Sequence, residues 1–440
     1  MAARSLHYGR PTIDVAIGYW DMALAANRMS YSGKLEKVSF LQNLMQRLRV
    51  EDIIFVVCAA TCVYPLGYYS YVPSLSAIYM NAKYAVIALI AVLILLKRYK
   101  PSLIATMIVG FDAYLLITTI AFDGNVNRWA QFALYRIALI CVFDYMLSKR
   151  PVFALGTVTL ICLAHLAINE ALGSAGTSSL NVDNAMYWLG IRVRIAGFAL
   201  PAMAFSLLFC IYSKISKLIK LPILIAVYAL AITFFIQKNV STALVSSSLS
   251  LILLLLFIVY KKFVKRIALT AVIATVALNF AIVFFNFQNK FSWLIEGILG
   301  KSLTLTGRVS IWHSVLSKMQ GHYLFGHGVG SGIPFIYEFG EPITYEHNQL
   351  LNVLFSGGII GLVFLFIILF LTFWSITSDE PSPYTSVVAA FLLAMCVQMI
   401  SEHPYENALF ALLLLFGYRY RDIPLPEPQR LFKSIRFRLF

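Results

Sequence analysis

Stretches of about 20 apolar residues, each long enough to cross a bilayer, recur along nearly the whole chain. Only 12% of the 440 residues are charged and 60% are hydrophobic, whereas soluble domains average about 25% charged residues. In a bilayer, every backbone polar group must be satisfied inside the protein, which leaves helices or closed barrels. The length of the apolar stretches favours helices. The sequence therefore predicts an all-α polytopic membrane protein without a soluble second domain.

The apolar stretches predict twelve transmembrane helices. They are expected near 53–72, 76–96, 102–121, 128–147, 152–169, 195–213, 221–237, 240–260, 267–285, 350–374, 384–401 and 407–418. These helices divide the chain into an N-terminal segment (1–52), nine helices (53–285), a large loop (286–348), three helices (349–418) and a basic tail (419–440).

The positive charges orient these helices, because Lys and Arg concentrate in cytoplasmic loops. With an even number of crossings and the N-terminus inside, 25 of the 35 Lys and Arg fall on the cytoplasmic side. Of the 20 Asp and Glu, 10 do so when Asp144, at the inner end of the span 128–147, is included. The net charge of +15 then lies entirely on that face, where it suits anionic lipid rather than nucleic acid. The segment 1–52 is expected to be either a cytoplasmic extension or an interfacial helix. The loop 286–348 is expected outside.

Chemistry is expected on the outer side, since irregular backbone and polar groups at depth are tolerated where they line a cavity. In the large loop, the apolar spacing predicts a short amphipathic helix over 307–319, with Thr306 as its N-cap. Arg308 then lies in the first turn, where the helix dipole disfavours a cation. A bound anion would remove this conflict. The alternative is an arginine that points into water.

Two further patterns follow in the same loop. Gly326, Gly328 and Gly330 alternate with other residues, which indicates either a phosphate-binding turn or an ordinary tight turn. His347 stands at the start of a long apolar helix, where an imidazole can act as a general base near neutral pH or can simply be a polar boundary residue.

Other ionisable groups fall at the outer ends of helices or within them. Asp112 and Arg136 lie near the middle of consecutive spans, and we expect a structural ion pair rather than a substrate contact. Arg192, Arg194 and Lys238 are cations at the outer surface that suit an anionic head group. His403, between two glutamates, is a candidate sugar contact.

Several common catalytic patterns do not occur in the sequence. It has no Asp-x-Asp pair for a metal-bound nucleotide sugar, no Gly-x-Ser-x-Gly elbow and no Walker lysine loop. The expected catalyst therefore uses Arg and His without metal, nucleotide or other cofactor.

Three motifs together resemble the O-antigen ligase and polymerase superfamily. They are Thr306-Gly307-Arg308 followed by Trp312, the glycine-spaced turn 326–330, and His347-Asn348 followed by Gly357-Gly358 and Gly361. The detailed resemblance covers about 300–365, and the twelve-span layout with one large outer loop is similar over the whole chain.

This resemblance implies a GT-C-like membrane glycosyltransferase of the bacterial inner membrane, with both termini in the cytoplasm and the active site on the periplasmic face. Such proteins transfer a glycan en bloc from undecaprenyl diphosphate to a sugar hydroxyl, with inversion and without metal. By resemblance, Arg308 would hold the diphosphate, and His347 would take the acceptor proton or position the leaving group. Relatives carry a second arginine where this chain has Lys238. Lys238, or Arg192 or Arg194 in an Arg-x-x-Gly-like segment, would take its place. Trp312, Tyr345, Asn348 and His403 are expected glycan contacts.

Three functions remain open at this point. A polymerase that joins repeat units of O-antigen, capsule or exopolysaccharide is preferred, because the motifs around Arg308 and His347 look closer to polymerase relatives. Its partners would be a lipid-linked donor, a lipid-linked repeat unit as acceptor, membrane lipids and a chain-length regulator. A ligase acting on lipid A core is the first alternative. A flippase for lipid-linked oligosaccharides is the second, although the two halves of the chain show no convincing correspondence of the kind carriers have.

Overall fold

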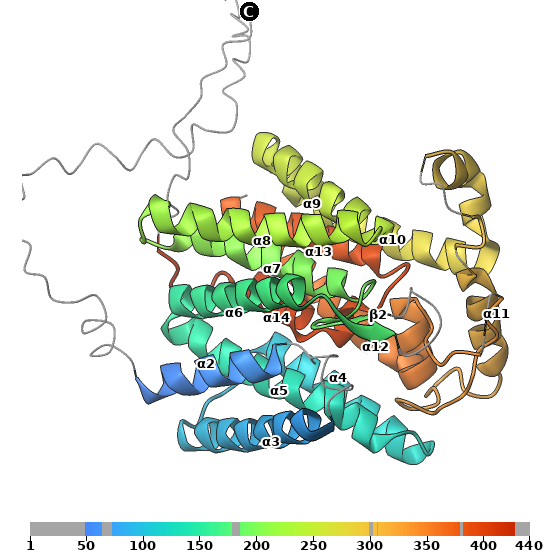
Figure 1. Cartoon of the computed structure of the whole chain (residues 1–440), viewed down its shortest axis with the longest axis horizontal. Coiled ribbons are helices and arrows are strands. Elements are labelled where there is room, and N and C mark those ends of the chain that lie inside the picture. The colour runs from blue at the N-terminus through green and yellow to red at the C-terminus, as the bar shows by residue number, and fades with distance from the viewer. Residues whose placement is uncertain are drawn as a thin grey trace, which may run out of the picture.

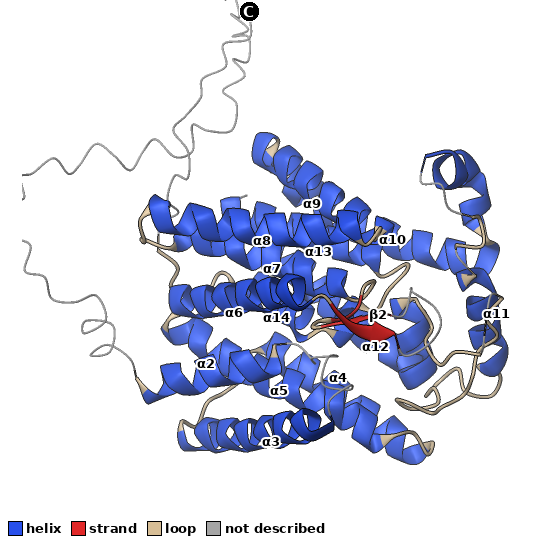
Figure 2. Cartoon of the chain, in the orientation of Figure 1, coloured by secondary structure: helices blue, strands red, loops and turns tan. Residues whose placement is uncertain are grey.

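The computed structural model describes residues 49–63, 73–177, 185–298, 302–305, 307–338, 340, 342–378 and 382–426. The prediction for the N-terminal segment therefore lies almost wholly outside the described residues, as does most of the basic tail. Helices make up nearly all of the rest (Figure 2).

Each of the twelve predicted spans contains a helix. They are α2 (Val50–Cys62), α3 (Pro73–Leu96), α4 (Leu103–Ala121), α5 (Val126–Lys149), α6 (Pro151–Leu172), α7 (Ile195–Tyr212), α8 (Lys217–Gln237), α9 (Ser241–Val259), α10 (Lys261–Phe285), α12 (Gln349–Ser378), α13 (Pro383–Gln398) and α14 (Ala408–Arg419). Within the described residues, nine helices are long and apolar enough to cross a membrane. The all-α polytopic fold is confirmed. The number of twelve crossings stays a prediction, because α2, α13 and α14 have 13, 16 and 12 described residues.

The long helices lie side by side, and the large loop between α10 and α12 covers one end of the bundle (Figure 1). The loop contains a 3₁₀ helix (Phe287–Phe291), a π-helix (Trp293–Ile298) and α11 (Arg308–Lys318). The segment between α6 and α7 forms a small antiparallel sheet that the sequence did not predict, with β1 (Ser174–Thr177), β2 (Ala185–Tyr187) and β3 (Gly190–Ile191).

The centre of the bundle is α7, whose side chains are almost all buried. It packs against α6, α8, α13 and α14, and α14 also packs against α5 and α12. The segment 399–407, which joins α13 to α14, therefore enters the middle of the bundle. It contains a short 3₁₀ turn, Pro404–Glu406.

A buried ion pair fixes this 3₁₀ turn. Arg136 Nε donates a hydrogen bond of 3.0 Å to Asp112, as the sequence predicted, and a second guanidinium nitrogen donates to the Tyr405 carbonyl at 2.9 Å. Tyr135 donates to the Glu406 carbonyl at 3.1 Å, and the Tyr405 amide donates to Gln349 Oε1 at 2.8 Å. Helices α4, α5 and α12 thus hold the turn from three sides.

The glycine-spaced turn does not leave its amides free for a phosphate. The His327 and Gly328 amides donate to the carbonyls of Phe355 and Ser356 in α12, at 2.7 and 3.0 Å. Helix α12 breaks at Gly358, where φ is 64° and a Cβ would lie 2.2 Å from the Leu324 carbonyl oxygen. The loop therefore fills the break in α12, and the tight-turn interpretation is correct.

Candidate active site

Arg308 occupies the first position of α11, as the sequence predicted. The predicted cap is wrong, however. The N-cap residue is Gly307, with a φ of 79°, and its amide is bound by the Thr304 hydroxyl at 3.3 Å. Thr306 itself lies outside the described residues. A glycine fits this position because a left-handed backbone conformation carries no Cβ penalty there.

The anion that the position of Arg308 requires is supplied by the protein itself. A guanidinium nitrogen of Arg308 donates to Glu402 Oε1 at 2.8 Å. The Arg308 side chain is 16% exposed and that of Glu402 only 3%. A cation at a helix N-terminus is thereby balanced by a carboxylate from the segment between α13 and α14, 94 residues away in the sequence.

His347 faces the same carboxylate. It lies in a turn with a φ of 50°, two residues before α12, and its Nδ1 is 3.8 Å from Glu402 Oε1. That separation is longer than a hydrogen bond, so the contact is electrostatic. Burial lowers the pKa of the His347 imidazole, and the nearby Glu402 charge opposes this lowering. At neutral pH the ring is consequently able to accept a proton.

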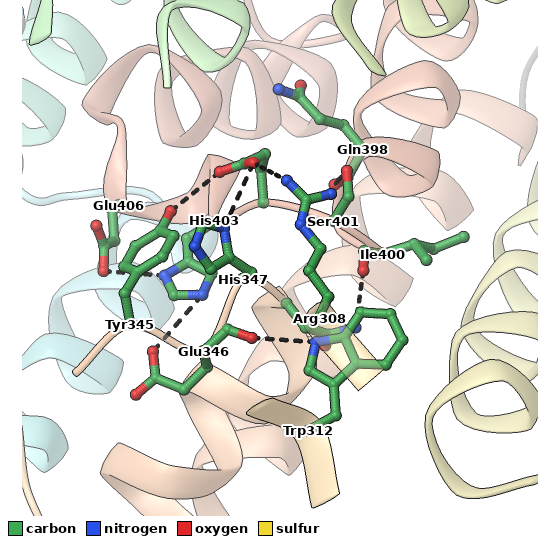
Figure 3. A network of polar contacts seen from close by, with 12 residues as sticks. Arg308, Trp312, Tyr345, Glu346, His347, Gln398, Ile400, Ser401, His403 and Glu406 are labelled. Carbon is green, nitrogen blue, oxygen red and sulfur yellow. Dashed lines mark hydrogen bonds and ion pairs between the residues drawn. The ribbon is translucent and has the colours of Figure 1, made fainter. Parts of the chain in front are cut away.

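Glu402 is the centre of this cluster, and Figure 3 labels its partners Arg308, His347 and Tyr345. Besides Arg308 and His347, it contacts Tyr345, whose hydroxyl donates to Oε2 at 3.2 Å. Burial raises the pKa of the Glu402 carboxyl, but the contact with His347 and the charge of Arg308 outweigh burial and bring the pKa to about 2. Glu402 is therefore a carboxylate at any physiological pH.

Tyr345 joins the Glu402 cluster to a second group around His403. The Arg194 guanidinium carbon lies over the Tyr345 ring, 4.2 Å from its centroid. The His403 ring also contacts Tyr345, with 4.2 Å between the two ring centroids. His403 stands between two carboxylates, with Nδ1 3.3 Å from Glu406 and Nε2 3.6 Å from Glu346. Figure 3 shows Tyr345, His403, Glu406 and Glu346 pointing toward one another.

The two acids beside His403 differ in their electrostatic environment. For Glu406, burial raises the pKa, but His403 and the charges of Arg194 and Arg128 outweigh burial and lower it to about 2. For Glu346, burial dominates and raises the pKa. Glu346 also accepts a hydrogen bond from Asn352 at 3.1 Å.

Two small cavities, each of about 40 Å³, adjoin the cluster on either side of Phe132, Tyr345 and Glu406. The first is lined by Phe132, Arg194, Gly197, Tyr345, Gln398, Glu402, His403, Pro404, Glu406 and Asn407. The second includes Arg128, Ser331, Glu346 and Asn352 in its lining. The cluster is thus open to small groups on both faces.

Two predicted glycan contacts have structural roles instead. Trp312 is 1% exposed, and its indole N–H donates to the Glu346 carbonyl at 3.1 Å, so it holds α11 against the segment that carries His347. Asn348 is fully buried; its amide donates to Asn279 and Ile400, and its oxygen caps the Leu351 amide. All of its hydrogen-bonding groups are engaged, which corrects the expectation that it binds sugar.

Of the three remaining outer cations, Arg194 is the one that stacks on Tyr345 of the cluster. Arg192 donates to the Lys238 carbonyl at 3.0 Å, and the Lys238 ammonium lies over the Tyr187 ring at 5.5 Å. These two cations form a separate group at the end of α8 and the small sheet. Arg194 is therefore the better candidate for the second phosphate contact.

Sequence reasoning missed the importance of Glu402 and Glu406. Both were noted only as neighbours of His403. The available signal was their position: two carboxylates and an imidazole within five residues, at the outer end of an apolar helix, are costly to bury unless they are paired. Their partners, Arg308 and Arg194, come from distant segments, so the pairing itself is visible only in three dimensions.

Chemically, the cluster combines an anion-binding cation with a neutral imidazole beside a permanent carboxylate. A guanidinium that can release Glu402 can bind a phosphate oxygen. An imidazole whose Nδ1 faces a carboxylate offers Nε2 as a base. The arrangement suits the transfer of a group away from an anionic leaving group to a hydroxyl.

Comparison with known proteins agrees with this interpretation. A search of curated proteins finds no match. The family model described as O-antigen ligase matches residues 226–366, from within α8 to within α12, a range that contains Lys238, Arg308 and His347. The match covers about a third of the chain, and it supports a similarity of this part to the O-antigen ligase and polymerase superfamily.

Proposed function

We propose that the protein is a polysaccharide polymerase. It transfers a glycan en bloc from undecaprenyl diphosphate to a sugar hydroxyl of another lipid-linked repeat unit, at the periplasmic face of the bacterial inner membrane. The observation that supports glycan transfer from a diphosphate donor is the convergence of Arg308 and His347, 39 residues apart, on one buried carboxylate, Glu402. The preference for a polymerase comes from the sequence motifs around Arg308 and His347.

The donor enters by exchange of anions at Arg308. In the present structure Glu402 occupies the guanidinium. A diphosphate carries more charge and more oxygens than a carboxylate, so it can take over this cation with bidentate geometry. Arg194, stacked on Tyr345 nearby, is the second cation within the same cluster.

The transfer step uses His347. The acceptor hydroxyl attacks the anomeric carbon of the donor glycan and gives its proton to His347 Nε2. The bond between that carbon and the phosphate oxygen breaks, and undecaprenyl diphosphate leaves with the electron pair, stabilised by Arg308. A new glycosidic bond forms with inversion, because attack and departure occur on opposite faces. Glu402 then stabilises the imidazolium through Nδ1.

The ligase is a second candidate, because the family model that matches residues 226–366 carries that description. A ligase would use the same donor chemistry and move the glycan to lipid A core. Arg308 and His347 serve both reactions equally well. The acceptor alone separates the two enzymes.

A deletion strain distinguishes them. Loss of a polymerase leaves surface lipid with one repeat unit, and full-length polymer returns on complementation. Electrophoresis of the envelope glycans shows the difference. Bare lipid A core together with polymer on the undecaprenyl carrier would contradict the polymerase and establish the ligase. If the protein is a polymerase, a chain-length regulator is its expected partner in the same membrane.

A further inference from the structure

The first cavity beside the cluster has a feature that the proposed reaction does not use: buried amide groups without partners. Both polar atoms of the Gln398 side chain and Nδ2 of Asn407 have no hydrogen-bond partner among the described residues. Gln398 is 2% exposed and Asn407 5%. Both residues line the cavity. Buried polar groups are almost always hydrogen-bonded, so three such atoms around one cavity require a ligand group or ordered water.

The charged groups of the same wall already have partners. Glu402 accepts from Arg308 and Tyr345, Glu406 contacts His403, and the Arg194 guanidinium stacks on Tyr345. Three of the cavity-lining atoms without a hydrogen-bond partner belong to amides, which donate and accept without charge. These amides suit neutral hydroxyl groups, whereas the Arg194 guanidinium on the same wall suits the phosphate beside them.

The size and shape of the cavity agree with this chemistry. A volume of about 40 Å³ accommodates a few groups of the size of a water molecule, as the hydroxyl edge of a sugar ring presents. The apolar wall is Phe132, which is half-buried and lines both cavities. Opposite, Gly197 contributes no side chain, and a Cβ there would lie 3.8 Å from Asn407 Nδ2.

The cavity also has the correct position. Its wall includes Glu402, whose carboxylate contacts both Arg308 and His347. A ring whose hydroxyl edge enters it is therefore adjacent to the groups to which we assign the diphosphate and the proton transfer.

We propose that this cavity binds a neutral pyranose ring of the lipid-linked glycan, with Gln398 and Asn407 as hydrogen-bonding partners of its hydroxyls. This proposal takes its substrate, a lipid-linked glycan, from the proposed function. It adds the residues that recognise the sugar. The ring belongs either to the donor, next to the diphosphate, or to the acceptor; the chemistry is the same, and the experiment separates the two.

The test uses two conservative variants of the full chain, Gln398→Met and Asn407→Ser. Methionine keeps the length of Gln398 without its polar groups, and serine retains the ability of Asn407 to cap the Leu409 amide. Ser401→Ala is the matched control, because the Ser401 hydroxyl binds the Gln398 carbonyl in the same turn and does not line the cavity. Native mass spectrometry of the detergent-purified protein measures binding of undecaprenyl diphosphate, bare and carrying the host strain's repeat unit.

We expect each variant to weaken binding of the glycosylated carrier by a factor of roughly 2 to 10, the contribution of an uncharged hydrogen bond. Binding of the bare carrier should not change, which assigns the ring to the donor. An unchanged affinity for both carriers with a raised KM for the acceptor glycan assigns it to the acceptor.

Two results would overturn the proposal. One is that neither the affinities nor KM differ from wild type. The other is that the two variants lose affinity for the bare and the glycosylated carrier alike, and that Ser401→Ala loses it as well, because this pattern indicates a loosened fold. Failure of the diphosphate assignment has a different signature: Arg308→Ala then keeps its affinity for the bare carrier while Gln398→Met still loses affinity for the glycosylated one.

Discussion

Replacement of Glu402 by Gln should damage both the fold and the reaction, because one buried carboxylate serves three neighbours. The pKa of Glu402 is lowered from 4.5 to about 2. At 1.36 kcal/mol per unit, this lowering corresponds to about 3 kcal/mol of stabilisation of the carboxylate form. The Gln variant loses this contribution and also leaves Arg308 buried without its countercharge.

The pH dependence identifies the origin of that loss. A lowered pKa contributes stability that is fully present above the unfolded-state value near 4.5 and is lost as the pH falls from about 5 toward 2. The melting temperature of the purified wild-type protein should therefore fall as the pH is lowered through this range. In Glu402→Gln it should fall less steeply. Glu406, whose pKa is also about 2, retains its own share of acid sensitivity in both proteins.

The rate of glycan transfer should respond as well. The Glu402 charge raises the pKa of His347 against the lowering by burial. In Glu402→Gln the acid limb of the pH–rate profile should consequently shift to lower pH, and the rate at neutral pH should fall as the imidazole becomes a weaker base. Glu402→Asp, which keeps the charge, is the control and should recover part of both effects. A Gln variant with wild-type melting temperature, rate and pH profile would refute this account of Glu402.

Arg308→Ala should lose about two to three decades of transfer rate, since loss of an oxyanion contact costs on the order of 2–4 kcal/mol; Arg308→Lys should recover only part, and full activity of the alanine variant at normal protein level would exclude the assigned role. His347→Ala should insert and fold but lose 10²–10⁴-fold in rate, measured on purified protein with lipid-linked donor. If the alanine variant is active and the pH–rate profile of the wild-type protein has no limb near neutral pH, His347 is not a general base. Cysteine accessibility should place residue 331 outside and residue 262 inside, and labelling of residue 331 only after the cytoplasmic face is exposed would reverse the topology.

The sequence predicts the helices well because, in a bilayer, each span depends only on its own apolar residues. Twenty apolar residues specify a helix whatever surrounds them, so each predicted span contains one. The outer segments follow other rules. The small sheet at 174–191 depends on pairing between residues of modest apolar content, and the break at Gly358 depends on a loop that fills it.

The candidate site was predictable only in part for the same reason. The position of Arg308 in a helix first turn is a local property, and it correctly indicated an anion. That the anion is Glu402, and that His347 shares it, depends on how α12 and the segment 399–407 pack. Trp312 and Asn348 are predicted to contact sugar because they lie in a functional motif. In the structure, the Trp312 indole binds the Glu346 carbonyl and Asn348 caps the first turn of α12.

The junction between the glycine-spaced turn and the break in α12 has a mechanical consequence. The loop that carries Arg308 is attached by backbone hydrogen bonds to the middle of α12, at Phe355 and Ser356, while His347 directly precedes the same helix. Arg308 and His347 are therefore both tied to the first half of α12, before its break at Gly358. The segment that carries Glu402 is tied to the same end of the helix, because the Gln349 amide donates to the Met399 carbonyl and the Tyr405 amide donates to Gln349. A shift of this half of α12 would consequently carry all three groups together, so a lipid diphosphate that reaches Arg308 has to displace the Glu402 side chain from it.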